Sequence, residues 1–211
     1  MNEALQHLRQ LDPVIMPALI ERVGQPSLRR RRPDFAGLAA IVVAQQVSTA
    51  SAAAIFGRLE TVLSPLTAEA VLRATEQDLR SAGLSANKIQ TLRNLAQAIT
   101  SQTLELEALA SLPAEEARNR LIALPGIGPW TADVYLLFCL GHGDAWPSGD
   151  LALQEAVRLV LQFEARPGAA EMDRIGARWR PHRGAAAYLL WAYYRVCAPM
   201  RRKNVGVPEP A

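Results

Sequence analysis

The feature that most constrains this chain is the run Leu-Pro-Gly-Ile-Gly-Pro-Trp-Thr-Ala at residues 124–132. Apolar residues at helical spacing precede it over residues 113–123, and a long apolar run follows Pro129 as far as Gly141. Its two glycines allow positive φ and carry no Cβ to hold a ligand away. A tight turn that opens into a helix also points backbone N–H groups outward at the positive end of the helix dipole. The run therefore predicts either a seat for one phosphate or an ordinary helix–helix connection.

The rest of the chain repeats apolar residues every three to four positions, and strand signals are scarce. Capping residues and glycine or proline stops mark the ends of the expected helices. We expect helices at residues 13–23, 35–45, 48–63, 67–74, 75–82, 86–100, 104–112, 113–123, 130–141, 151–163, 172–179 and 184–197. The sequence thus predicts an all-α protein with a frayed tail from Arg201 to Ala211.

Composition narrows the class of protein further. With 211 residues the chain suits one domain or two closely packed lobes. It shows neither a signal-peptide pattern nor a membrane-length apolar run, so we expect a soluble cytoplasmic protein with no membrane contact. The formal net charge is +3, and only Lys88 and Lys203 are lysines. This preference for arginine over lysine would suit binding to phosphates, which the planar guanidinium matches. A GC-rich genome would produce the same preference.

The numbers and positions of the cysteines and histidines argue against an iron–sulfur or zinc site. Cys139 lies within an apolar run, which predicts a buried free thiol, and Cys197 is the only other cysteine. An iron–sulfur cluster needs four thiolates, so two cysteines exclude one. His7, His142 and His182 are scattered without ligand spacing, so no zinc or other divalent site is expected.

Several segments, taken in order, resemble the helix–hairpin–helix (HhH-GPD) DNA glycosylase superfamily. The glycine-containing run is similar to its DNA-binding hairpin, and Trp-Pro-Ser-Gly-Asp-Leu at residues 146–151 resembles the loop that presents its catalytic aspartate. Residues 44–48 and 180–191 match further segments, so the resemblance covers roughly residues 34 to 195. Lyase relatives carry Lys at the position of Trp130. A Trp at this position is similar to the 3-methyladenine DNA glycosylase II (AlkA-like) branch.

The resemblance implies a fold of two helical lobes with the substrate in a cleft between them and no additional β domain. One lobe is expected near residues 34–128 and the other from residues 1–33 with 129–200. The implied function is a monomeric, nucleoid-associated DNA glycosylase that removes alkylated bases from double-stranded DNA and requires no cofactor. Because Trp130 replaces the Schiff-base lysine, no lyase activity is expected. A non-catalytic DNA-binding module, or a glycosylase for mismatched, oxidised or deaminated bases, is the alternative.

Asp150 is the candidate catalytic residue. Breaking an N-glycosidic bond leaves positive charge on the sugar, which a carboxylate in a dry site stabilises. Gly-Asp before an apolar helix is also a strong N-cap signal, which needs no catalysis. The match to the family's aspartate in order and spacing favours catalysis, with Asp150 stabilising the sugar and orienting or activating water. Asp133, Asp144 and Asp173 are weaker competitors.

Aromatic residues are expected to receive the flipped base. The resemblance places Trp130 and Trp191 in the base pocket, with Tyr188 adding an edge, and π faces suit a positively charged alkylated purine. The alternative for each is a place in the helical core. Val134 stands where the family carries an aromatic residue, and Leu151 is a second departure beside the aspartate, so a less aromatic pocket is expected.

The resemblance also assigns contacts with DNA. Gln46 matches the wedge that fills the gap left by the flipped base, with a structural cap as the alternative. The expected DNA-contacting residues are Gln45, Gln46, Ser48, Gly126, Gly128, Trp130 and Thr131. Relatives hold Na⁺ or K⁺ under the hairpin, and the matching main-chain carbonyls are those of Ile122, Leu124 and Ile127. The run Arg29–Arg32, and His182 with Arg183, are either DNA contacts or solvated surface.

Overall fold

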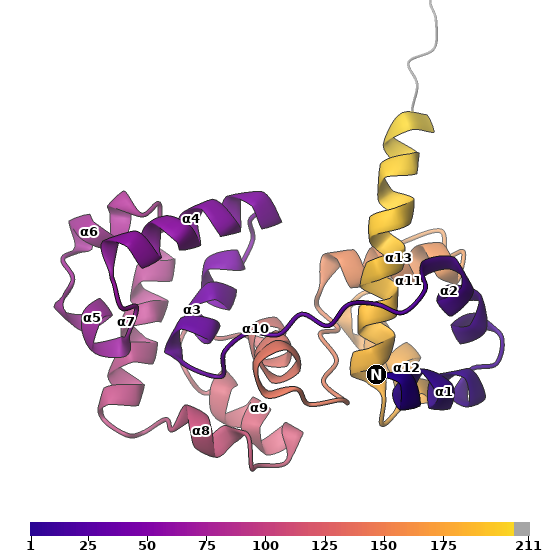
Figure 1. Cartoon of the computed structure of the whole chain (residues 1–211), viewed down its shortest axis with the longest axis horizontal. Coiled ribbons are helices and arrows are strands. Elements are labelled where there is room, and N and C mark those ends of the chain that lie inside the picture. The colour runs from indigo at the N-terminus through magenta and orange to yellow at the C-terminus, as the bar shows by residue number, and fades with distance from the viewer. Residues whose placement is uncertain (205–211) are drawn as a thin grey trace, which may run out of the picture. The chain divides into compact units, whose positions relative to one another are not determined.

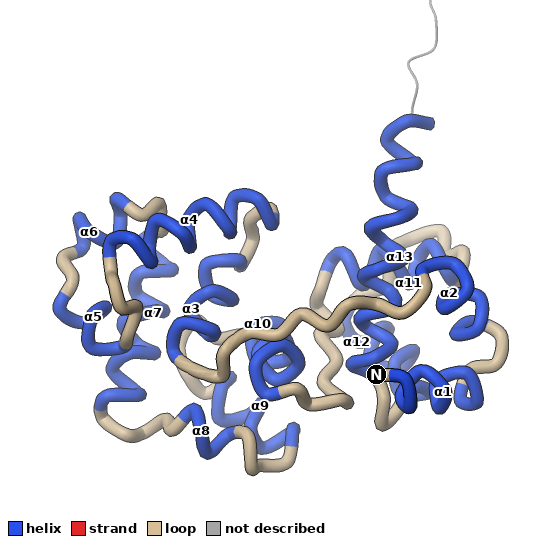
Figure 2. Tube along the Cα trace, viewed as in Figure 1, coloured by secondary structure: helices blue, strands red, loops and turns tan. Residues whose placement is uncertain are grey.

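A computed structural model describes residues 1–204 of the chain and the side chains as far as Cys197. The described residues form helices and loops with no strand, which confirms the all-α prediction (Figure 2). Two compact units divide the chain: a central unit of residues 29–142, and a terminal unit of residues 1–28 with residues 143 onward (Figure 1). Among the described residues, no helix is both long and apolar enough to cross a membrane.

The central unit is built around one helix that is apolar on every side. Its helices are α3 Phe35–Ala44, α4 Thr49–Val62, α5 Ala68–Arg73, α6 Glu76–Ser81, α7 Ala86–Thr100, α8 Leu106–Leu109, α9 Ala114–Ile122 and α10 Pro129–Tyr135. Helix α3 buries Phe35 and every residue from Gly37 to Val43, and α4, α7 and α10 pack against it. This burial follows from a sequence with no polar face, which only a core position accommodates.

Five helices of the central unit begin at a side-chain cap. Ser48 accepts a hydrogen bond from Ser51 N, and Thr75 forms a reciprocal capping box with Asp78. The side chains that cap in this way are Asp34, Ser48, Thr67, Thr75 and Ser85. Because each cap satisfies an otherwise unpaired backbone N–H, these starts were readable from sequence.

A π-helical turn follows directly after the last residue of α10, Tyr135. This turn, η1, spans Leu136–Leu140 and stops at Gly141 with φ 75°. The predicted buried thiol of Cys139 lies in this turn, and burial raises the Cys139 pKa to about 12. The turn therefore keeps the apolar run Leu136–Leu140 largely buried in the central unit.

The terminal unit is assembled from both ends of the chain. It contains α1 Asn2–Leu11, α2 Ile15–Val23, α11 Leu151–Val160, α12 Ala169–Gly176, the 3₁₀ turn η2 Ala177–Trp179 and α13 Arg183–Asn204. Helix α13 packs against α1, α2 and α11. The buried Trp179 indole donates to Asp12 Oδ2 at 3.0 Å, which ties η2 to the α1–α2 turn.

The units differ from the expected lobes at both boundaries. Helix α10 was expected with the second lobe but packs against α3 and α9 in the central unit, and residues 29–33 also belong there. Helix α1 was not predicted, although Leu5 and Leu8 bury one face of it. Helix α13 continues past the predicted end at Cys197 to Asn204, so residues 201–204 are not tail; the remainder lies outside the described residues.

Candidate functional site

The glycine turn between α9 and α10 has the geometry of a helix–hairpin–helix. Leu124 N donates to the Leu121 carbonyl and Ile127 N to the Leu124 carbonyl, both at 3.1 Å. Gly126 has φ 89°, and a Cβ there would overlap the Thr91 side chain of α7. Only glycine therefore fits this position.

Helix α10 opens directly from the turn. Gly128 is its N-cap, Pro129 its first residue, and Ala132 N is the donor to the Gly128 carbonyl at 3.1 Å. The backbone N–H groups that precede Ala132 therefore lie at the open end of the helix, where orphan donors attract anions. Residues 122–128 line a hollow of about 450 Å³. The three carbonyls expected to bind a monovalent cation belong to residues lining it: Ile122, Leu124 and Ile127.

Two of the expected DNA contacts have internal partners in the central unit instead. The Gln45 amide Nε2 donates to Thr131 Oγ1 at 2.8 Å and to the Gly126 carbonyl at 3.2 Å. Thr131 is buried, with 2% of its surface exposed. In this arrangement Gln45 fastens the end of α3 to the hairpin, and the Thr131 hydroxyl serves that contact.

The neighbouring loop from α3 to α4 is exposed. Gln46 has a positive φ of 55°, and its side chain is exposed. Ser48 is exposed too and caps α4 through Ser51 N at 3.1 Å. Ser48 thus caps α4, whereas the wedge role of Gln46 and its structural-cap alternative both stay predictions.

Asp150 begins α11 in the terminal unit. Its Oδ1 accepts a hydrogen bond from Leu153 N at 2.9 Å, so the N-cap expected from the local sequence is confirmed. The same oxygen accepts the Nε1–H of Trp191, on α13, also at 2.9 Å. The carboxylate therefore combines a capping position with a second, long-range donor, and its side chain is only half-buried.

The loop that presents Asp150 is anchored along its length. Asp144 forms a two-point ion pair with Arg183 at 2.9 and 2.8 Å. The Trp146 indole donates to the Met172 carbonyl at 3.0 Å. Gln154, buried in α11, donates to the Ser148 carbonyl at 2.9 Å. These contacts make residues 144–150 a rigid support for the acid.

The candidate pocket residues are divided between the two units. In the terminal unit, Tyr188 and Trp191 are buried and meet edge to face at 6.0 Å, whereas Leu151 is 62% exposed. In the central unit, α10 carries a half-buried Trp130 and a buried Val134. A pocket that uses both sets stays a prediction.

Two of the competing ionisable residues have structural partners. Asp133 is buried and pairs with Arg118 of α9 at 2.8 Å. Lys88 donates its Nζ to the Val43 carbonyl at 2.7 Å, and partial burial lowers the Lys88 pKa. Asp173 is exposed on α12. Asp150 stays the candidate acid.

The structure also locates His182 and the run Arg29–Arg32, for which the sequence left DNA contact or solvated surface open. The His182 ring stacks on His7 at 4.9 Å, with ring nitrogens 3.0 Å apart, a pairing invisible in the sequence. In the run Arg29–Arg32 all four residues are exposed, and Arg31 N is held by the Phe138 carbonyl at 3.0 Å. Among the described residues, no three His, Cys, Asp or Glu side chains gather to hold a metal.

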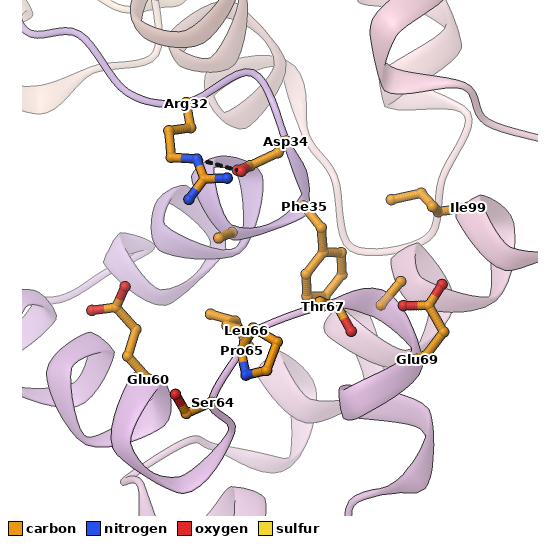
Figure 3. Close-up of a pocket in the computed structure, with 12 residues that line it drawn as sticks. Arg32, Asp34, Phe35, Glu60, Ser64, Pro65, Leu66, Thr67, Glu69 and Ile99 are labelled. Carbon is orange, nitrogen blue, oxygen red and sulfur yellow. Dashed lines mark ion pairs between the residues drawn. The ribbon is translucent and has the colours of Figure 1, made fainter.

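A second hollow, of about 440 Å³, lies between the start of α3 and the α4–α5 loop (Figure 3). Its polar groups serve local structure: Asp34 caps α3 and pairs with Arg32 at 2.8 Å, and Thr67 caps α5. Apart from Arg32, one of the possible DNA contacts, no predicted site residue lines it.

Known proteins similar to this chain share its fold and about 30% of its residues over the matched part. The family described as "HhH-GPD superfamily base excision DNA repair protein" matches residues 39–181. DNA-3-methyladenine glycosylase 1 of Schizosaccharomyces pombe is 30% identical over 169 residues, 78% of this chain and 74% of that protein. The S. pombe 3-methyladenine DNA glycosylase Mag1, in complex with abasic DNA, superposes with a TM-score of 0.82 at 29% identity, covering 90% of this chain and 95% of that one.

A bacterial relative is longer than this chain. The putative DNA-3-methyladenine glycosylase YfjP of Bacillus subtilis is 31% identical over 123 residues, 58% of this chain. The matched part makes up 43% of that relative, less than half of its length.

Proposed function

Because this chain belongs to the HhH-GPD superfamily of base excision DNA repair proteins, we propose that it is a monofunctional DNA glycosylase. Its substrate is double-stranded DNA carrying an alkylated base of the 3-methyladenine or 7-methylguanine type. The relatives named above are 3-methyladenine glycosylases, which supports this substrate class. The enzyme acts as a monomer at the nucleoid in the cytoplasm.

The position of Asp150 is the observation that carries the proposal. Its carboxylate stands at the start of α11, held by Leu153 N and the Trp191 indole, in a loop anchored by buried contacts. In the proposed reaction the C1′–N bond breaks and its electron pair leaves with the base. Asp150 stabilises the positive sugar while a water oxygen bonds to C1′. The water proton passes to the carboxylate or to solvent.

In this proposal the hairpin binds the DNA backbone. A flipped base must be unpaired and unstacked at a cost of a few kcal/mol, so the backbone has to be held firmly. The amides at the open end of α10 hold one phosphate, and the exposed Gln46 fills the gap that the base leaves. The carbonyls of Ile122, Leu124 and Ile127 belong to residues around one hollow, which fits Na⁺ or K⁺. Such an ion would stiffen the turn.

The chemistry stops at base release. A Schiff-base lyase needs an amine at the site, and the hairpin carries Trp130 where lyase relatives carry Lys. The described Lys88 ammonium already donates to the Val43 carbonyl at the end of α3. The product is therefore an intact abasic strand.

Base release from a lesion panel tests the proposal, comparing wild type with Asp150→Asn. The substitution removes the charge and is expected to slow release of 7-methylguanine roughly 100-fold or more. Asp173→Asn, at an exposed site on α12, is the matched control and should release base at the wild-type rate.

Each result of this assay has a distinct meaning. Equal release by Asp150→Asn and wild type refutes the mechanism. Binding without release by wild type indicates the non-catalytic module. Release confined to mismatched, oxidised or deaminated bases refutes the substrate class.

A further inference from the structure

Two helices of the terminal unit hold the same oxygen of Asp150. Leu153 N, in the first turn of α11, donates to Oδ1 at 2.9 Å. The Trp191 Nε1–H, from the middle of α13, donates to that oxygen at 2.9 Å as well. Trp191 is only 8% exposed, so packing fixes its ring.

The second donor determines how the carboxylate is turned. An N-cap bond alone fixes the position of one oxygen but leaves the carboxylate plane some freedom to rotate. Because the indole comes from a separate, buried helix, it restricts that rotation. A carboxylate oxygen accepts through two lone pairs, so these two donors occupy Oδ1.

We propose that Trp191 is a positioning residue for Asp150, an inference that rests on the proposed glycosylase function. The resemblance assigns the Trp191 ring to the base pocket; the geometry adds a separate role for its N–H. The indole neither gives nor takes a proton in the reaction. It holds the carboxylate in the orientation that meets C1′, so that little reorganisation is needed when charge develops there.

Trp191→Phe separates the two roles, because it keeps an aromatic ring and removes the N–H. Single-turnover release at saturating protein is expected to slow roughly 10- to 100-fold, the range for a lost hydrogen bond to a charged group. The Kd for abasic product DNA should stay within about twofold, since that complex has no base to hold. The slowing should be the same for the two proposed substrates, 7-methylguanine and 3-methyladenine.

Trp179→Phe is the matched control. Trp179 is also buried in the terminal unit, and its Nε1–H also donates to a carboxylate, that of Asp12. Its loss should lower the Tm as much as Trp191→Phe does or more, with wild-type release per folded molecule. Slowed release in Trp191→Phe alone then reports positioning rather than stability.

A double-mutant cycle with Asp150→Asn completes the kinetic test. If Trp191 acts through the carboxylate, Trp191→Phe should add less than about twofold to the loss caused by Asp150→Asn. Independent, multiplying losses would overturn the proposal. So would wild-type release by Trp191→Phe, or a loss that differs strongly between the two bases.

An NMR measurement checks the contact without turnover. The chain has four tryptophans, and the indole ¹H–¹⁵N signal of Trp191 is assigned as the one missing in Trp191→Phe. Asp150→Ala should move this signal and leave that of Trp179 in place; an unmoved signal overturns the proposal. A wild-type protein that releases no base refutes the proposed function itself, which an active wild type with an unaffected Trp191→Phe does not.

Discussion

Gly126 is a position in the hairpin that only glycine can occupy without strain. Its φ of 89° lies in the left-handed region, and the space where a Cβ would stand is filled by Thr91 of α7. Gly128, two residues on, has φ −91° and open space around it. A side chain is therefore excluded at Gly126 but sterically allowed at Gly128.

Gly126→Ala should lower the free energy of unfolding by about 2–4 kcal/mol, because backbone strain adds to overlap with Thr91. Gly128→Ala should cost about 1 kcal/mol or less, as alanine is only a poorer N-cap there. Urea unfolding of the two variants measures both values. Equal losses would show that the turn is not held in this conformation.

At this scale the sequence predicted identities better than contacts. Asp150 was recognised as both cap and candidate acid, and the structure confirms the cap. Its partner Trp191 lies 41 positions later, and no local pattern encodes such a contact. Gln45 and Thr131 were expected to contact DNA, and the structure adds a partly buried hydrogen bond that joins them. Short motifs indicate which side chains are polar and close to the turn, but not the direction in which they point.

Among the elements, α9 and α10 are joined by more than their turn. Arg118 of α9 pairs with Asp133 of α10 at 2.8 Å, and the Asp133 side chain is only 6% exposed. An ion pair on the outer side of α9, between Arg120 and Glu116, is about half exposed at both ends. The two pairs share a helix and differ in burial.

Asp133→Ala should destabilise the protein by about 2–4 kcal/mol, because it leaves the partly buried Arg118 without this carboxylate. Glu116→Ala should cost under about 0.5 kcal/mol, since solvent screens the exposed pair. Thermal unfolding of the pair of variants compares them. A loss at Glu116 as large as that at Asp133 would contradict the assignment of burial.

Element starts were predictable because their signals are local. Side-chain caps at Asp34, Ser48, Thr75 and Ser85 act within three residues, so the sequence carries them explicitly. The residues at which helices end, and the type of helix, were harder to predict. The π turn after Tyr135 fits the same apolar pattern as an α-helix. Helix α1 was missed although Leu5, Leu8 and Leu11 recur at helical spacing, a signal that the sequence does carry.

For the molecule as a whole, binding and chemistry should respond differently to salt. Affinity for a duplex depends on phosphate contacts and released counterions, so the Kd should rise about tenfold or more between roughly 50 and 200 mM salt. Single-turnover release at saturating protein should change by less than about twofold, because bound substrate already makes those contacts. Fluorescence anisotropy and base-release assays measure the two. A salt-independent Kd would contradict binding through the DNA backbone.

The all-α class followed from the sequence, whereas the division into units did not. Periodicity is a property of single helices, and it leaves open which helices pack together. The expected boundary after Gly128 followed the glycine turn, but the chain changes units only at Gly143. Helix α10 stays with α3 because both bury apolar faces against each other.

The order in which the units can form follows from how the chain threads them. The central unit is one unbroken stretch, residues 29–142, and has all its partners once that stretch has left the ribosome. Helices α1 and α2 precede the central unit in the chain, whereas α13, which packs against both, follows it. The apolar faces of α1 and α2 therefore lack this partner until the whole central unit has been translated, and the unit that carries Asp150 is completed only when α13 emerges.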